Sequence, residues 1–321
     1  MFLGGHDLTR SIQENYLTFS QEARGRSRVY EILAAEVAGD PAVLAFLASL
    51  PPVKRQPNLL FAAARYLLGR PATIGSLRQL VAGRGAELAA VIQARRTQTN
   101  EPARCASLLP ALMQLPQPLA LLEVGASAGL TLLPDRYSYD YAGHRIAGTD
   151  PQAPVLRCDP RGPVPLPDRV PDVRWRAGLD LNPLDVTSDD DVRWLRCLLW
   201  PGEPGRGPRL EGAIATARRD PPAVHRGDLL TDLPALARQA PAGATLVIYH
   251  SAVLGYLSAA ERAQFAQTVH GLDAVWLSND VRLSPDVPVL AAGEASFHLI
   301  RDGSTLLAAA DSHGAWLHWL P

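Results

Sequence analysis

The sequence predicts an α/β protein with a helical N-terminal region and a mostly parallel sheet that ends in an antiparallel hairpin. Three observations favour this fold class. Apolar residues recur at helical spacing as far as residue 118. From residue 119, strand-like apolar runs alternate with helical segments. The last two runs flank Asp302-Gly303, a dipeptide typical of hairpin turns. We therefore predict two domains, residues 1–118 and 119–321.

The N-terminal region is predicted to be all helical. Apolar residues three or four positions apart, such as Leu8, Ile12 and Tyr16, indicate helices with one buried face. The sequence Gly39-Asp40-Pro41 is typical of a helix end. No segment in this region alternates as a half-buried strand does. Predicted helices cover residues 8–19, 29–37, 43–50, 58–68, 77–92 and 108–115.

The region from residue 119 onward is predicted to form the sheet. Helical segments between short apolar runs are typical of parallel strands joined by crossovers. Residues 137–146 alternate around Gly143 and indicate a hairpin, whereas the proline-rich residues 151–172 indicate an extended loop. Predicted strands cover residues 119–124, 173–181, 223–227, 244–250, 274–278, 296–301 and 305–310. Predicted helices between them cover residues 190–199, 210–219, 229–239 and 259–271.

Composition and charge narrow the class of protein. Hydrophobic residues make up 47% of the 321 residues and charged residues 20%, as in a globular protein with a sizeable core. The net charge of −1 and the lack of a long basic run argue against a nucleic-acid partner.

The cysteines and the apolar runs predict a cytoplasmic protein without a membrane partner. Cys105, Cys158 and Cys197 are widely spaced and odd in number, so no disulfide framework is expected. The first twenty residues carry charges and lack the apolar core of a signal peptide. No apolar run is long enough to span a membrane.

The most informative segment is the turn after the first predicted strand, Glu123-x-Gly125-x-Ser127-x-Gly129. One interpretation is a hydrolase in which Ser127 is the nucleophile, with an acid and then a histidine later in the chain. The helical region upstream of the turn and Pro134 shortly after it disfavour this interpretation. The acid could be Asp228 or Asp273, and the histidine could be His298 or His313, since these residues follow Ser127 in the order that such a triad requires.

The other interpretation is a nucleotide-binding turn. Gly125 and Gly129 allow a ligand to approach backbone N–H groups closely. Asp180 follows the next predicted strand, where a carboxylate can accept hydrogen bonds from two ribose hydroxyls. Asp228 follows the third predicted strand and can accept a hydrogen bond from an adenine amino group. Either aspartate can instead cap a helix. Both aspartates and Glu123, however, lie at the carboxyl ends of predicted strands, where open α/β sheets bind ligands.

These residues resemble the motifs of the class I S-adenosylmethionine-dependent methyltransferases. The segment Glu123 to Gly129 is similar to their first motif, with Ser127 replacing the middle glycine. Gly178-Leu-Asp180-Leu-Asn-Pro183 is similar to the second motif and Gly227-Asp228 to the third. The resemblance implies a Rossmann-like methyltransferase sheet, mostly parallel with an antiparallel last strand. It also implies S-adenosylmethionine as the cofactor, bound by Glu123, Gly125, Ser127, Gly129, Asp180 and Asp228.

A second resemblance covers nearly the whole chain. It is to an uncharacterised bacterial family, a domain of unknown function usually grouped with those methyltransferases. The segments that carry it are Gln98-Thr-Asn100-Glu101 with Arg104, Glu123 to Leu130 with Asp135-Arg-Tyr137, Arg174 to Asp185, Arg193-Trp-Leu195, Trp200-Pro201 and His250-Ser251.

Acceptor chemistry is expected at the end of the fourth predicted strand. Tyr249 and His250 are the predicted catalytic residues, with His250 as a general base or as a donor that orients the acceptor. The residues predicted to bind the acceptor are Arg96, Gln98, Asn100 and Tyr256. The histidines His225, His298, His313 and His318 lack metal-ligand spacing, so no metal is expected.

The sequence therefore predicts a methyltransferase whose partner is a small or medium-sized acceptor molecule. Two alternatives stay open. One is a methyltransferase-like binding protein without catalysis, which is suggested by Ser127 in place of the middle glycine. The other is a serine hydrolase with Ser127 as its nucleophile.

Overall fold

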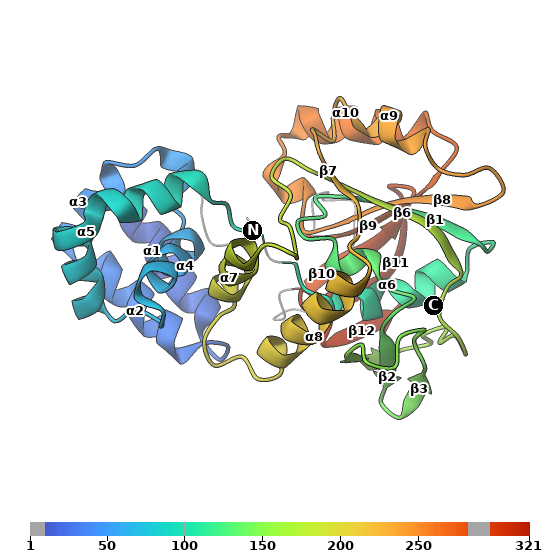
Figure 1. Cartoon of the computed structure of the whole chain (residues 1–321), viewed down its shortest axis with the longest axis horizontal. Helices are drawn as coiled ribbons and strands as arrows, with labels where there is room; N and C mark the ends of the chain where they lie inside the picture. The colour runs from blue at the N-terminus through green and yellow to red at the C-terminus, as the bar shows by residue number, and fades with distance from the viewer. Residues whose placement is uncertain (1–9, 99, 282–295) are drawn as a thin grey trace. The chain divides into compact units, whose positions relative to one another are not determined.

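The computed structural model describes residues 10–98, 100–281 and 296–321, and Figure 1 shows the order of its elements. These residues form two compact units. The helical unit contains the described residues up to 98 together with Asp189–Gly207, and the sheet unit contains those of Asn100–Ser188 and Pro208–Pro321. The division into domains after residue 118 stays a prediction.

The helical unit confirms five of the six helices expected in the N-terminal part of the chain, and the sixth is α6 (Arg104–Met113) of the sheet unit. Capping residues set the starts of several of them. Ser11 and Glu14 form a capping box before α1, and Thr73 and Ser76 form one before α5. Leu8, expected in the first helix, lies outside the described residues. The helices are α1 (Ile12–Ala23), α2 (Arg28–Ala38), α3 (Pro41–Ala48), α4 (Pro57–Leu68), α5 (Ile74–Ala94) and α7 (Asp189–Leu198), with the 3-10 turn η1 (Pro52–Lys54).

The core of the helical unit is a cluster of aromatic rings. Phe61 lies against Tyr16, Phe19 and Tyr30, with ring centroids 4.9–6.0 Å apart. Trp200, which follows α7, adds its ring against Phe19 at 5.0 Å. The Tyr16 hydroxyl is buried and has no hydrogen-bond partner within the described residues. An unsatisfied buried hydroxyl costs free energy that the ring's burial must offset.

The sheet unit is built on a large mixed sheet that contains nine strands in the described residues, in the order β5-β12-β11-β10-β9-β8-β1-β6-β7. The run from β7 to β9 is parallel, as predicted. The predicted hairpin of β10 and β11 is confirmed, with Asp302 and Gly303 at positive φ in its turn. The strands are β1 (Leu119–Val124), β5 (Asp159–Arg161), β6 (Val173–Asp180), β7 (Val224–Arg226), β8 (Thr245–Ser251), β9 (Val275–Asp280), β10 (Ser296–Arg301), β11 (Thr305–Asp311) and β12 (Trp316–Trp319).

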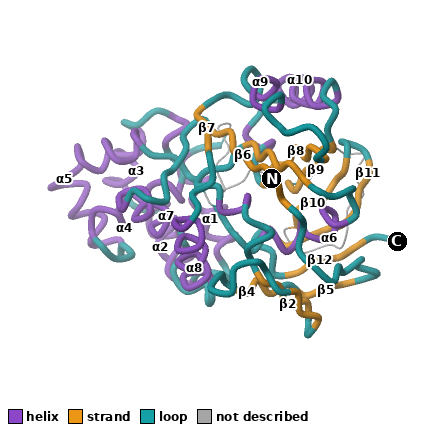
Figure 2. Tube along the Cα trace, turned by 45° about the vertical axis from the view of Figure 1, so that its right-hand side comes forward, coloured by secondary structure: helices purple, strands orange, loops and turns teal. Residues whose placement is uncertain are grey.

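Helices cover both faces of the parallel strands. Helices α9 (Leu233–Ala237) and α10 (Ala259–His270) lie together on one face, and α6 (Arg104–Met113) lies on the other (Figure 2). The first face packs Leu236 and Phe265 of these helices into one apolar cluster with strand residues such as Ile248. A further long helix among the described residues is α8 (Arg206–Arg219). Both faces of β1 are thus buried, which explains its unbroken apolar sequence.

A second, three-stranded sheet follows the β1 turn and corrects one prediction. The expected hairpin is present as β2 (Ser138–Tyr141) and β3 (His144–Ile146). The proline-rich residues 151–172, expected to be an extended loop, instead contribute β4 (Val155–Arg157) beside β2, and β5 to the large sheet. These strands were missed because three residues carry too little periodicity to be recognised.

The helix predicted over residues 229–239 is also shorter than expected. Asp228 accepts a hydrogen bond from the Leu230 N–H at 2.8 Å, and its own N–H donates to Asp232 at 2.7 Å. These side chains close a turn before the helix begins. Only Leu233–Ala237 is α-helical, with Pro234 in its first turn.

Replacing Tyr16 by Phe should stabilise the protein, because it removes a buried hydroxyl for which the described chain offers no partner. We expect a gain of about 1 kcal/mol in the free energy of unfolding, measured by urea denaturation. Tyr139→Phe is the matched control, because the equally buried Tyr139 hydroxyl donates to the Pro134 carbonyl at 2.6 Å. That variant should lose about 1 kcal/mol. A Tyr16→Phe protein less stable than wild type would contradict this account.

Candidate functional site

The turn that follows β1 has a backbone that glycine favours. Gly125 and Gly129 have φ of 71° and 70°, and Ser127 between them has φ of 54°. This left-handed conformation costs a non-glycine residue roughly 1–2 kcal/mol, so other contacts must hold Ser127 in place. The turn leads into a short 3-10 helix, η2 (Leu130–Leu132), rather than the long helix that follows a nucleophile elbow.

Asp180, at the end of β6, holds the turn. Its Oδ2 accepts a hydrogen bond from the Ser127 N–H at 2.8 Å, and its Oδ1 accepts one from the Asn182 N–H at 2.7 Å. The Ser127 carbonyl in turn accepts from the Leu184 N–H at 3.0 Å. The sequence-predicted residues Ser127 and Asp180 are therefore brought together.

The glycines of the turn are in close contact with other parts of the protein. A Cβ added at Gly125 would lie 2.3 Å from Cγ2 of Val253, in the loop after β8. A Cβ added at Gly129 would lie 2.6 Å from Cγ of Pro222, just before β7. Both glycines are thus required for packing as well as for their positive φ.

The turn lies where the direction of strand order reverses. From β1, the order runs through β6 to β7 on one side and through β8 to β9 on the other. In open α/β sheets, ligands bind at the carboxyl ends of the strands at such a reversal point. The segment Gly125–Gly129 and the loop Ser251–Leu254 are the two chain segments that leave the strands there.

Glu123 is the buried acid at the end of β1. Its Oε1 accepts a hydrogen bond from Thr131 Oγ at 2.5 Å, whereas Oε2 has no hydrogen-bond partner in the part of the chain that is described. Burial raises the pKa of this carboxyl to about 8, although the Thr131 hydrogen bond and the Arg104 charge act in the opposite direction. Glu123 is therefore largely protonated at neutral pH.

Asn100 joins this network from the segment before α6. Its Oδ1 accepts a hydrogen bond from the Leu130 N–H at 2.7 Å, and its Nδ2 donates to Thr131 Oγ at 3.5 Å. Of the four residues predicted to bind an acceptor, Asn100 is the one that these contacts connect to the β1 turn. Arg96 and Gln98 belong to the helical unit, and Tyr256 is 57% exposed in the turn η3 (Leu254–Tyr256).

Arg104 is a residue of this region that the site prediction omitted. Its guanidinium donates to the Ser251 carbonyl at 3.3 Å and to the Ser312 carbonyl at 2.9 Å, and it stacks on Phe297 at 5.4 Å. The side chain is 6% exposed. It connects the start of α6 to the end of β8 and to the turn after β11. The signal that could have revealed Arg104 was its place in the polar segment that carries the whole-chain resemblance.

Tyr249 and His250 point to opposite faces of the sheet, as neighbours in a strand must. The Tyr249 hydroxyl donates to the Thr131 carbonyl at 3.0 Å, and burial raises the pKa of this phenol well above its usual value. His250 is completely buried between Phe265 and Trp276, with its Nδ1 3.4 Å from Oδ2 of Asp280. Their catalytic roles stay predictions.

Asp228 lies beside Asp180 at the edge of the sheet. The Gly227 N–H donates to the Asp180 carbonyl at 3.0 Å, which places the ends of β6 and β7 together. The Asp228 carboxylate is half-buried and accepts from the Leu230 N–H, as described above. The predicted cofactor residues from Glu123 to Asp228 therefore occupy three adjacent strand ends.

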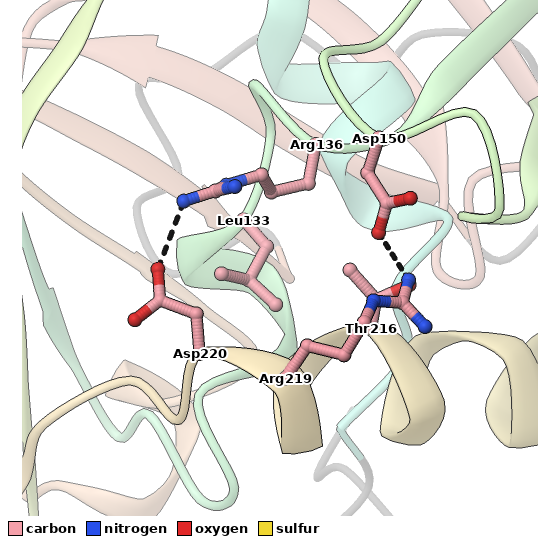
Figure 3. Close-up of a pocket in the computed structure, with 6 residues that line it drawn as sticks. All are labelled: Leu133, Arg136, Asp150, Thr216, Arg219 and Asp220. Carbon is pink, nitrogen blue, oxygen red and sulfur yellow. Dashed lines mark hydrogen bonds and ion pairs between the residues drawn. The ribbon is translucent and has the colours of Figure 1, made fainter.

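A pocket elsewhere in the sheet unit is small and electrically balanced. It is lined by Leu133 and Thr216 together with two ion pairs, Arg136 with Asp220 and Arg219 with Asp150 (Figure 3). Its volume of about 30 Å³ is enough for about two water molecules. This pocket has no room for an organic substrate.

The described ranges contain neither a metal-binding cluster nor a membrane-spanning helix. Nowhere in residues 10–98, 100–281 and 296–321 do three or more His, Cys, Asp or Glu side chains form a group that could hold a metal ion. Over the same ranges, no helix is both long enough and apolar enough to cross a membrane.

Comparison with known protein families shows to which of them the chain belongs. The family model described as "Uncharacterized protein conserved in bacteria (DUF2332)" matches residues 13–319. The chain belongs to this family. The match confirms the resemblance to an uncharacterised bacterial family and extends over both compact units of this DUF2332 protein. No curated protein and no solved structure matches the chain.

Gly125→Ala should destabilise this DUF2332 protein, because the new methyl group meets Val253 and alanine is strained at this φ. Val253→Ala removes both Cγ atoms and leaves the Val253 Cβ at 3.4 Å, an ordinary contact distance. The double variant should therefore recover part of the loss, with a coupling of about 0.5–3 kcal/mol in a urea-denaturation cycle. Gly69→Ala, at a similar φ of 71° but with nothing within 4 Å, is the matched control. Additive effects of Gly125→Ala and Val253→Ala would contradict the contact.

Glu123→Gln should change how stability depends on pH. The folded-state pKa of about 8 lies above the ordinary value of 4.5, so the stability that the neutral carboxyl contributes is complete below pH 4.5. It is lost as pH rises from 4.5 to 8, at up to about 1.4 kcal/mol per pH unit. Urea denaturation between pH 5 and 9 should show a flatter profile for the variant.

Glu261→Gln is the control of opposite sign. Hydrogen bonds from Ser258 lower the pKa of the exposed Glu261 carboxyl, so its contribution is lost only as pH falls below the ordinary value of 4.5. Between pH 5 and 9 the Glu261→Gln variant should therefore keep the wild-type slope. Equal slopes for wild type and Glu123→Gln above pH 5 would show that Glu123 is not neutral in the folded protein.

Proposed function

We propose that the protein binds S-adenosylmethionine at the β1 turn of a Rossmann-like sheet and transfers its methyl group to a small or medium-sized acceptor. The observation that carries the proposal is the hydrogen bond between the Ser127 N–H and Asp180. It brings the glycine-containing turn of the first strand to the acid of the second at the reversal point of the sheet. Asp228 follows at the end of the third strand.

The residues at the turn fit such a cofactor. Asp180 lies at the end of the second strand, and a carboxylate at that position is the kind of acceptor that binds ribose hydroxyls. Glu123 adds a buried oxygen, Oε2, without a hydrogen-bond partner among the described residues. Asp228 would accept a hydrogen bond from the adenine amino group. When bound, the cofactor supplies an electrophilic methyl group on a sulfonium sulfur.

The chain's own contribution to such a reaction is mainly positioning. Tyr249 and His250 are both buried, so neither presents a base at the surface. Methyl transfer needs a base only when the acceptor must lose a proton. Alignment of the acceptor with the methyl group supplies much of the rate in reactions of this kind. We therefore propose an acceptor that is already nucleophilic in its resting form.

A binding protein without catalysis is the second candidate, and one contact favours it. Val253 lies directly against Gly125, the first glycine of the turn, so a ligand must share this space with a protein side chain. Methyl transfer to any acceptor would exclude this candidate. The serine hydrolase has less support, because Ser127 is 3% exposed and precedes only a 3-10 turn. Labelling of Ser127 by a fluorophosphonate would favour the hydrolase over both other candidates.

Calorimetric titration with S-adenosylhomocysteine tests the proposal. Wild-type protein should bind, and Asp180→Asn should weaken binding by at least about tenfold, because a charged acceptor becomes a neutral amide. Asp159→Asn, on edge strand β5 with its side chain 59% exposed, is the matched control and should bind as wild type does. Folded wild-type protein that does not bind would exclude the proposed function.

A further inference from the structure

The loop that follows β8 is held by the end of the neighbouring strand β9. Ala252 has a positive φ of 63°, and its N–H donates to the Asn279 carbonyl at 3.1 Å. The next two N–H groups, of Val253 and Leu254, both donate to Oδ2 of Asp280 at 2.7 and 2.8 Å. The positive φ of Ala252 is strained, and the two hydrogen bonds to Asp280 compensate this strain. Without Asp280, we expect the loop to leave this conformation.

Asp280 is a buried acid whose acceptors are engaged by backbone. It is 1% exposed, and its Oδ1 accepts a third hydrogen bond, from the Val281 N–H at 2.9 Å. The His250 ring lies beside it, with Nδ1 3.4 Å from Oδ2. Burying a carboxylate is costly unless hydrogen bonds compensate it. Here the compensating donors belong mainly to the loop, so the same bonds that stabilise Asp280 fix the loop.

The loop is in turn the neighbour of the β1 turn. Val253 is the residue whose side chain would meet a Cβ at Gly125. On the other side, the Ser251 carbonyl accepts from Arg104, and Ser251 Oγ accepts from Asn279 Nδ2 at 3.1 Å. The position of Val253 beside Gly125 is therefore set by groups from β9 and α6, none of which belongs to the turn itself.

We propose that Asp280 is a positioning residue that holds Val253 against Gly125, and that Val253 thereby forms one wall of the ligand site at the β1 turn. The first part stands on the hydrogen bonds alone, and the second rests on the proposed function. Asp280 acts through the loop and does not itself touch the ligand. The side chain of Val253 then limits the size of the group that fits next to Gly125.

An aspartate is needed at this position because three N–H groups converge on it. In Asp280→Asn, one carboxylate oxygen becomes an NH₂ group, which would face either the Val281 N–H or the N–H groups of Val253 and Leu254. The NH₂ group and a backbone N–H are both hydrogen-bond donors, so at least one of the three hydrogen bonds is lost. Because the amide is isosteric with the carboxylate, the core around it is disturbed little.

Amide hydrogen exchange of full-length Asp280→Asn tests the first part. Exchange at Val253 and Leu254 should accelerate by at least about tenfold, while Val247 and Ile248 within β8 keep wild-type rates. Asp302→Asn is the matched control: Asp302 accepts the Trp276 N–H at 2.9 Å near the other end of β9. That variant should leave exchange in the loop unchanged. Wild-type exchange at both loop amides in Asp280→Asn would overturn the proposal.

Titration of the same variants with S-adenosylhomocysteine tests the second part. Asp280→Asn should bind at least about tenfold more weakly than wild type, and Asp302→Asn should bind equally well. Faster loop exchange with unchanged affinity would overturn the role of Val253 as a wall. If wild-type protein does not bind, the proposed function and this second part both fail, and the exchange data alone decide whether Asp280 positions the loop.

Val253→Ala gives an independent test should Asp280→Asn fail to fold. The variant leaves all three hydrogen bonds to Asp280 in place and removes only the side chain beside Gly125. Exchange at Leu254 should stay at the wild-type rate while the affinity for S-adenosylhomocysteine changes by several-fold, on the order of 1 kcal/mol. Unchanged affinity in a folded Val253→Ala protein that retains wild-type loop exchange would overturn the wall.

Discussion

The hydrogen bond from the Ser127 N–H to the Asp180 carboxylate is the interaction on which the candidate site depends. Ser127 is held in a left-handed conformation that its side chain disfavours. A charge-assisted bond of 2.8 Å to a nearly buried carboxylate is strong enough to compensate that strain. Since Asp180 ends β6 and Ser127 follows β1, this bond also fixes two parallel strand ends relative to each other. The glycine turn keeps its shape because the second strand holds it.

A second set of contacts supports the turn from the opposite side. Thr131 links the Glu123 carboxyl to Asn100, and the Tyr249 hydroxyl binds the Thr131 carbonyl. These groups are buried, so each contact is made in a medium where electrostatic interactions are stronger than in water. The unusual member is Glu123, which keeps one oxygen without a hydrogen-bond partner in the described chain and a pKa near 8. The end of β1 is thus polar, and one of its hydrogen-bond acceptors has no partner in the described chain. Buried groups with shifted pKa values of this kind are common at ligand-binding sites.

Much of the fold could be predicted from sequence because it follows from local patterns. The apolar run Leu119–Val124 and the Asp302-Gly303 turn are such patterns, and both predictions are confirmed. The contact between Val253 and Gly125 and the bonds of Asp280 could not be predicted, because they join residues far apart in the chain. Periodicity shows that Tyr249 and His250 face opposite ways, but not that His250 lies under α10. The meeting of Asp180 with the β1 turn was expected only because adjacent parallel strands end at the same edge.

Edge strand β5 carries a consequence for association between copies of this chain. A strand at the edge of a sheet offers unpaired N–H and C=O groups that can recruit a strand from another molecule. In β5 the middle residue is Pro160, which has no N–H to offer, and it stands between the charged residues Asp159 and Arg161. Arg161 also lies over the ring of Trp316 at 4.6 Å, which covers an aromatic face beside that edge. This three-residue strand thus disfavours the addition of a strand from another molecule, and with it the aggregation that such pairing would cause.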